Sequence, residues 1–310
     1  MSKKMPKKIL VTLGILIGSF LILYFVFPGT MFSILARLER GSAGLTLKSI
    51  NAAGWQTPYL EGGQGETVLL IHGFGGDKDN FTRFAKYLTG KYRVISPDLP
   101  GFGENQRKPD ENYAYSKQVP RIIALLDALQ VDKFHVAGNS MGGCISGLLA
   151  EAYPERVLSA TLIDNAGFQE PQMSEREKIT RTGVNPLLVN NVEDFDRLMD
   201  FIFVNRPFIP WPLKEYFAAR AVQNRGFNEK IFQDISEERY LLQSKFANVK
   251  VPVLVIWGDT DRVIDVSATE TMKKIKPDIE VQIMPQTGHS PMLEKPNETA
   301  QLMLDFIKNK

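Results

Sequence analysis

Apolar positions between residues 67 and 284 fall into short runs, with segments of helical spacing between them. The runs at 67–71, 93–96, 134–137, 160–163, 253–257 and 281–284 predict buried strands. Segments 80–88, 116–129, 141–153, 266–275 and 297–307 predict helices. Two further strands, 45–50 and 57–60, precede them and are expected to be antiparallel. This alternation predicts an α/β fold with a mostly parallel sheet and helices on both faces.

The alternation stops between residues 168 and 248, where no strand pattern occurs and prolines separate several helical stretches. This region predicts a helical cap inserted into a core formed by 45–167 and 249–310. Large apolar side chains are concentrated between residues 201 and 217. They suit the wall of an acyl pocket, with Phe201, Phe208 and Trp211 as candidates, but packing of the cap onto the core would use the same residue types.

The N-terminus has the pattern of a membrane segment. The basic residues 1–8 precede an uncharged apolar run at 9–27, and residues 28–44 are expected to connect it to the core. As a helix, this run reaches almost across a ~30 Å hydrocarbon layer. Four lysines before it favour a cytoplasmic N-terminus, which predicts a single pass and an extracytoplasmic, for example periplasmic, domain.

A cleaved secretory signal is the alternative for this segment. Gly41-Ser42-Ala43 offers the small residues that a signal peptidase prefers. The apolar part of a signal is, however, usually about 7–15 residues. Arg37, Glu39 and Arg40 also separate these small residues from the apolar run. We therefore favour an uncleaved anchor.

Composition and charge exclude several classes of function. The formal net charge is +2, and outside the N-terminus the basic residues form no patch, so nucleic-acid binding has no electrostatic support. A single cysteine, Cys144, excludes a disulfide framework within the chain. His72, His135 and His289 are too scattered to indicate a metal site, and we expect neither a metal nor another cofactor.

The strongest chemical motif lies where the strand at 134–137 meets the helix at 141–153. Here Ser140 occupies the centre of a Gly-x-Ser-x-Gly sequence whose glycines are Gly138 and Gly142. A sharp turn between strand and helix exposes the hydroxyl and strains the backbone of the serine. The helix start also directs N–H groups at the reaction site. Ser140 is therefore the predicted nucleophile.

Candidates for an acid and a base follow two later strands. Asp259 and Asp261 come after the strand at 253–257, and His289 follows the strand at 281–284. His289 is the predicted general base, and one of the two aspartates would orient its imidazole. The loop after the strand at 67–71 contains Phe74, whose N–H we expect to form an oxyanion hole with that of Met141. His72 is expected to hydrogen-bond to nearby loops.

The segments 72–76, 138–143 and 288–291 together are similar to the α/β-hydrolase superfamily. That resemblance covers the chain from about residue 65 onward. With the anchor, residues 77–80 and the cap at 185–212, the chain most resembles membrane-bound monoacylglycerol lipases of the α/β-hydrolase-domain type and lipases of cold-living bacteria. The resemblance implies a Ser140–Asp261–His289 triad, because the family pattern Gly-x-x-Asp-x-Val matches Asp261 and not Asp259.

The same resemblance implies hydrolysis of carboxylic esters, with acylglycerols, above all monoacylglycerol, as lipid substrates and no cofactor. Two alternatives are weighed against it. Carbon–carbon hydrolases of aromatic ring-cleavage products share the fold and the Gly-Asn-Ser-Met-Gly-Gly sequence, but their substrates are soluble and do not call for an anchor. A non-catalytic binding protein on this fold would be expected to lack a triad member, and all three are present.

Overall fold

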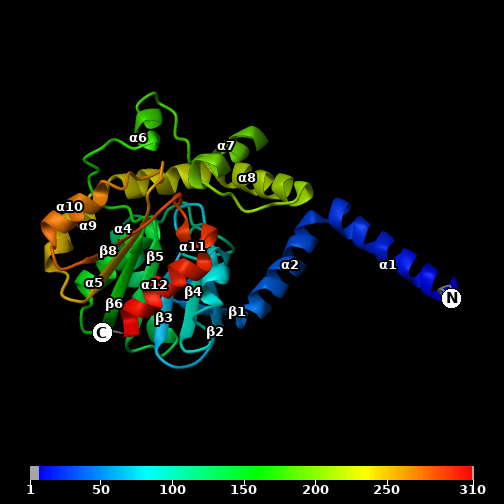
Figure 1. Ribbon diagram of the computed structural model, residues 1–310, viewed down its shortest axis with the longest axis horizontal. Coiled ribbons are helices and arrows are strands. Elements are labelled where there is room, and N and C mark those ends of the chain that lie inside the picture. The colour runs from blue at the N-terminus through cyan, green and yellow to red at the C-terminus, as the bar shows by residue number, and fades with distance from the viewer. Residues whose placement is uncertain (1–6, 309–310) are drawn as a thin grey trace.

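The computed structural model describes residues 7–308 (Figure 1). Residues 1–6 of the basic segment, and 309–310, lie outside the described residues. The sheet has eight strands in the order β1-β2-β4-β3-β5-β6-β7-β8. The strands are β1 Leu45–Ala52, β2 Trp55–Gly62, β3 Thr67–Ile71, β4 Arg93–Pro97, β5 Phe134–Asn139, β6 Val157–Ile163, β7 Val253–Gly258 and β8 Glu280–Met284. β2 is antiparallel to β1 and β4, and the other pairs are parallel, as predicted.

Both faces of the sheet are buried under helices. Around β3, Leu69 and Ile71 join one hydrophobic cluster while Val68 and Leu70 join another, which is the alternation that a strand covered on both sides requires. The core helices are η1 Lys78–Phe81 (a short 3-10 helix), α3 Thr82–Ala85, α4 Tyr115–Ala128, α5 Met141–Ala152, α10 Ala268–Ile275, α11 Pro291–Glu294 and α12 Pro296–Lys308. Side chains of α4, α5 and α10 belong to the first cluster, and those of α3 and α12 to the second.

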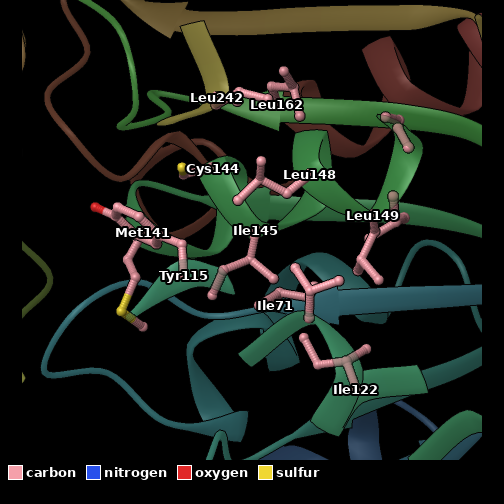
Figure 2. Close-up of a cluster of buried hydrophobic side chains, with 14 of the residues drawn as sticks. Ile71, Tyr115, Ile122, Met141, Cys144, Ile145, Leu148, Leu149, Leu162 and Leu242 are labelled. Atoms are coloured by element: carbon pink, nitrogen blue, oxygen red, sulfur yellow. The ribbon is translucent and has the colours of Figure 1, made fainter. Parts of the chain in front are cut away.

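Helix α5 lies at the centre of the first cluster. Figure 2 shows Ile145, Leu148 and Leu149 of this helix together with Ile71 of β3. Cys144 of α5 is fully buried in the same cluster, and burial raises the pKa of its thiol. Its thiol is therefore a packing group and not a reactive one. This packing fixes the helix whose first turn carries Ser140.

The elements between β6 and β7 are all helices, and the sequence had predicted no strand there. They are α6 Glu175–Thr180, α7 Val192–Ile202, α8 Trp211–Ser236, α9 Leu241–Lys245 and the 3-10 helix η2 Phe246–Asn248. Asn191 caps α7, because its side chain accepts the N–H of Asp194 at 2.7 Å. In Figure 1, α6, α7 and α8 lie across one end of the sheet.

The apolar run near the N-terminus forms α1 Lys7–Val26, which projects away from the rest of the molecule (Figure 1). Its mean hydropathy is 2.6 and it is long enough to cross a membrane, although a signal sequence would have the same properties. The predicted connector is helical: α2 Pro28–Ser42 begins after a proline-marked break, with Pro28 in its first turn. The ring of Phe32 in α2 packs 5.0 Å from that of Phe217 in α8, so α2 joins α1 to the cap.

Candidate active site

Ser140 occupies the turn between β5 and α5 in a strained conformation. Its φ is +55° and its ψ is −116°, in a region that residues with a Cβ rarely adopt. A Cβ at Gly138 would lie 2.2 Å from the carbonyl oxygen of Gly142, and one at Gly142 would lie 2.1 Å from that of Ile71. Only glycine permits so close an approach of β5, α5 and β3. The strain is held because Ser140 N–H donates to the carbonyl of Ile163 at 2.9 Å.

The histidine and one aspartate meet beside this turn. His289 Nδ1 donates to Asp261 Oδ2 at 2.7 Å, and both side chains are buried. The other oxygen of Asp261 accepts the N–H groups of Val263 at 2.7 Å and Ile264 at 3.1 Å. This geometry fixes the orientation of the imidazole and leaves Nε2 as its free ring nitrogen. His289 lines the same cavity as Ser140.

Asp259 is not at this junction. It is exposed, and its carboxylate accepts from the Thr260 hydroxyl at 2.7 Å, which is the role of a turn-forming residue. Asn139 instead links the serine turn to the histidine loop, since its amide donates to the carbonyl oxygens of Ile163 at 3.2 Å and His289 at 2.9 Å. The structure thus brings Ser140, His289 and Asp261 together without Asp259.

The predicted oxyanion donors come from two different segments, the start of α5 and the loop after β3. Met141 begins α5, so its N–H has no acceptor within the helix. Phe74 lies in the loop after β3, where a Cβ on neighbouring Gly73 would come within 3.3 Å of the Ser140 Cβ. In the part of the chain that the structure describes, neither N–H donates to a protein acceptor. Both remain free to bind an oxyanion.

His72 binds nearby loops, as expected from the sequence. It is fully buried, its Nδ1 donates to the Gly73 carbonyl at 2.8 Å, and its Nε2 accepts the Leu99 N–H at 3.1 Å. Burial lowers its pKa to about 4, so the ring is neutral near pH 7. His72 therefore orients the Phe74 loop and is not positioned as a second base.

A buried ion pair supports the same loop. Lys78 is 1% exposed, and its Nζ lies 3.0 Å from Oδ2 of the buried Asp98. Asp98 also accepts the N–H groups of Lys78 and Glu104, each at 2.8 Å. Burial alone would lower the pKa of Lys78, but the charges of Asp98, Asp77 and Asp79 raise it above its ordinary value. The ion pair thus joins η1 to the end of β4.

We expect Lys78→Met to destabilise the protein by about 3–5 kcal/mol, because it leaves the Asp98 carboxylate buried without its ammonium partner. Urea unfolding of the full chain in detergent, followed by circular dichroism, measures the change. The exposed Lys86 on the same segment supplies the control Lys86→Met. Equal unfolding midpoints for the two variants would show that the ion pair is dispensable.

Asp164 is a residue of this site that the sequence analysis missed. It follows β6 with a φ of +42°, and it is fully buried. One oxygen accepts the Gly258 N–H at 2.9 Å, whereas Oδ2 has no donor among the described residues. Burial and the neighbouring Asp261 charge raise its pKa well above the ordinary value. The available signal was its place directly after a buried strand, at the edge where Ser140 also lies.

Asp164, Asp261 and His289 have the donor types of a metal site, and their nearest ligand atoms all lie within 4.8 Å of one another. The His289–Asp261 contact of 2.7 Å, however, is a hydrogen bond that leaves no room for an ion between these atoms. The arrangement suits acid–base chemistry. A protonated Asp164 would place a neutral carboxyl group, and not a second charge, beside Asp261.

Ser140 adjoins two cavities. The larger has a volume of about 440 Å³ and is lined by α2, α7, α8 and the Phe74 loop. The smaller, of about 270 Å³, is lined by aromatic residues that include Tyr115, Phe168 and Phe232 and by charged residues that include Arg176, Glu177 and Arg239. Ester substrates have an acyl part and an alcohol part on either side of the carbonyl. Two cavities that meet at the serine provide separate space for each.

The three acyl-pocket candidates occupy different places. Phe208 lines the larger cavity and is 89% exposed. Phe201 is buried in the hydrophobic core, and the Trp211 ring lies 6.0 Å from that of Phe25 in α1. Phe32 of α2 also lines the larger cavity, a position that the sequence pattern of residues 28–44 did not predict. Phe208 thus stays a candidate for acyl contact, and Trp211 lies beside the anchor.

A strained serine that shares a cavity with a buried histidine–aspartate pair defines a serine hydrolase built on a parallel sheet. The sequence profile of the alpha/beta hydrolase fold matches residues 66–296. The chain therefore belongs to the α/β-hydrolase family, which confirms the predicted fold class.

Among known proteins, Lipase 1 of Psychrobacter immobilis is 40% identical over 267 residues, with 84% of each chain covered. The monoacylglycerol lipase ABHD6 of Homo sapiens is 28% identical over 310 residues, covering 96% of this chain and 92% of the relative. The crystal structure of a membrane phospholipase A, described as a bacterial virulence factor, superposes with a TM-score of 0.90. It is 42% identical, and the match covers 98% of this chain and 99% of that one. The chain is a lipase-type ester hydrolase.

Proposed function

We propose that this enzyme cleaves acylglycerols, monoacylglycerol in particular, at a membrane by a Ser140–His289–Asp261 mechanism. The observation that carries this proposal is the 2.7 Å bond from His289 to the buried Asp261, in a cavity that also contains Ser140. The names of the relatives add support, since they include lipases and a monoacylglycerol lipase. The proposed mechanism is supported by His289 Nε2 and the N–H groups of Phe74 and Met141, which have no hydrogen-bond partner within residues 7–308.

In the first step His289 Nε2 takes the proton of the Ser140 hydroxyl, and Oγ attacks the ester carbonyl carbon. The N–H groups of Phe74 and Met141 stabilise the negative oxygen that forms. Asp261 stabilises the imidazolium. The C–O bond to the alcohol then breaks, and the alcohol leaves with the proton from His289. Water attacks the acyl-enzyme in the same manner and releases the fatty acid and free Ser140.

The anchor places this chemistry at a bilayer. We propose that α1 spans the membrane with a cytoplasmic N-terminus and a periplasmic or otherwise extracytoplasmic enzyme domain. The proposed division is an anchor at 9–27, a connector at 28–44, a cap at 168–248 and a core formed by 45–167 and 249–310. Support comes from two exposed apolar side chains of the cap: Phe208, which lines the larger cavity, and Trp211, whose ring lies 6.0 Å from that of Phe25 in α1. A lipid could then enter the larger cavity from the membrane.

A carbon–carbon hydrolase is the runner-up, since it would use the same fold and triad. The anchor and the lipase relatives favour ester hydrolysis over it. A binding protein without activity has less support, because His289 and Asp261 form the hydrogen bond that acid–base catalysis would use. Substrate tests separate the three.

The test is fatty-acid release from 1-oleoylglycerol in mixed micelles by the full-length chain, with p-nitrophenyl butyrate and an aromatic ring-cleavage product in parallel. We expect release from both esters and no cleavage of the ring product. Cleavage of the ring product alone would favour the carbon–carbon hydrolase. Inactivity toward all three would favour the binding protein.

Deleting residues 1–27 is expected to release the enzyme from membranes while p-nitrophenyl butyrate hydrolysis continues at a similar rate. The physical reason is that α1 lines neither cavity, whereas α2 with Phe32 is kept. Sedimentation of membrane fractions, followed by assay of pellet and supernatant, measures both effects, and the full-length chain is the control. A truncated chain that stays in the pellet would show that α1 is not the sole anchor.

A further inference from the structure

Two arginines line the larger cavity without an acidic partner. Arg107 donates from Nη2 to the Gly103 carbonyl at 3.2 Å, but its Nε is buried and unpartnered within residues 7–308. Arg220 of α8 lies over the Tyr216 ring at 5.7 Å. In the same described range, no carboxylate oxygen lies within 4.0 Å of either guanidinium. Arg83, which also lines this cavity, differs because it pairs with Glu39 at 2.6 Å.

This arrangement is unfavourable while the cavity holds no anion. An unsatisfied buried donor costs free energy, and two cations facing one another repel. Arg107 and Arg220 line the same cavity, and the pKa of Arg107 is lowered by burial and by the charge of Arg220, against the opposing charge of Asp98. An anion that accepts hydrogen bonds from the two arginines would remove both the unsatisfied donor and the repulsion between the cations.

Helix α8 extends the polar wall. Arg220, Asn224 and Asn228 are spaced four residues apart, so they lie on one face of the helix, and all three line the larger cavity. In the described part of the chain the Asn224 and Asn228 side chains make no hydrogen bond to protein. A pocket for a purely apolar ligand does not need such a row of hydrogen-bond donors. These donors suit a polar ligand with several oxygen atoms.

We propose that Arg107 and Arg220 bind the phosphate of a glycerophospholipid or lysophospholipid whose ester carbonyl lies at Ser140. This rests on the proposed function, because the same cavity contains Ser140 and His289. The planar guanidinium fork matches phosphate oxygens. A fatty-acid carboxylate forms at Ser140 itself, so an anion held by the Arg107 loop and α8 belongs to the alcohol part of the ester. The acyl chain then extends into the smaller cavity, along Tyr115, Phe168 and Phe232.

The experiment compares two substrates that differ only in the phosphate, 1-oleoyl-lysophosphatidic acid and 1-oleoylglycerol. The quantity measured is the ratio of their kcat/KM values for the full chain, for Arg107→Gln and for Arg220→Gln. Loss of a charge-assisted hydrogen bond is expected to lower this ratio roughly ten- to a hundredfold. Arg107→Lys, which keeps the charge, is expected to restore part of it.

Arg225→Gln is the matched control. Arg225 lies on α8 like Arg220, but it pairs with Glu229 at 2.9 Å and does not line the cavity. Its ratio is expected to stay that of the native chain. Because both substrates are assayed in one preparation, a smaller folded fraction cancels in the ratio.

The outcomes separate the two proposals. If the native chain hydrolyses 1-oleoylglycerol and the arginine variants keep the native ratio, the phosphate site is overturned while the proposed function stands. If the native chain hydrolyses neither lipid, both are overturned. Inorganic phosphate added to the 1-oleoylglycerol assay distinguishes a free anion. One outcome would assign the two arginines to free phosphate and overturn the lipid site. In it, phosphate inhibits the native chain but not Arg107→Gln, while the ratio of the two kcat/KM values is the same for both.

Discussion

Ser140→Ala is expected to lower ester hydrolysis by at least about 10⁴-fold, because the rate that remains without a nucleophile comes only from binding and the oxyanion donors. No other hydroxyl group lies at the apex of the β5–α5 turn. The variant should fold, since the neighbouring glycines and the hydrogen bond from residue 140 N–H to Ile163 do not involve the hydroxyl. Fatty-acid release from 1-oleoylglycerol measures the loss.

Two further measurements make this result specific. A fluorophosphonate probe, which forms a covalent bond with an activated serine, is expected to label the native chain and not the variant. Ser244→Ala removes an exposed hydroxyl of α9 that donates only to the Leu241 carbonyl, and it should keep both activity and labelling. A Ser140→Ala variant that is labelled and active would assign the nucleophile to another residue.

The sequence predicted the fold because each layer has a local signal. Five-residue apolar runs such as that of β3 and the turn around Ser140 depend on neighbours in the chain, and the structure has them at nearly the predicted positions. The choice between Asp259 and Asp261 depended on a family pattern. Geometry gives an independent reason, since only Asp261 bonds to His289.

Features formed by distant segments were not predictable in this way. The packing of α2 against the cap is one example, since Phe32 contacts Tyr216 and Phe217 of α8 nearly two hundred residues further along the chain. Arg107 and Arg220 line one cavity only because the cap folds over the loop after β4. Neither residue belongs to a sequence motif. The role proposed for them depends on the cavity that they line, which a local sequence pattern does not reveal.

The burial of Asp164 was also not predictable from the local sequence, although it lies at the same end of the sheet as Ser140. Its position after β6 was readable, but its burial beside Asp261 depends on four parallel strands ending together. One aspartate suffices to orient His289, and a second negative charge beside it would be unfavourable. The raised pKa of Asp164 removes that second charge, and the two carboxyl groups can therefore differ in role.

Asp261→Asn is expected to lower kcat roughly 10³- to 10⁴-fold, by the tautomer effect known for triad aspartates. Two N–H groups, those of Val263 and Ile264, point at Oδ1 of Asp261, so an asparagine would keep its oxygen there. Its NH₂ group would then face His289 Nδ1 and force the ring proton onto Nε2. A protonated Nε2 cannot accept the proton of Ser140. Steady-state kinetics with p-nitrophenyl butyrate measure the loss.

Asp164→Asn is the matched comparison, because it makes the same chemical change one strand away. A protonated carboxyl group and an amide both offer a donor to Asp261, so we expect at most a roughly tenfold loss of kcat. The Gly258 N–H would keep an oxygen acceptor in either case. Equal losses in the two variants would mean that Asp164 is ionised and shares the work of orienting His289. A larger loss at 164 than at 261 would reverse the roles of the two aspartates.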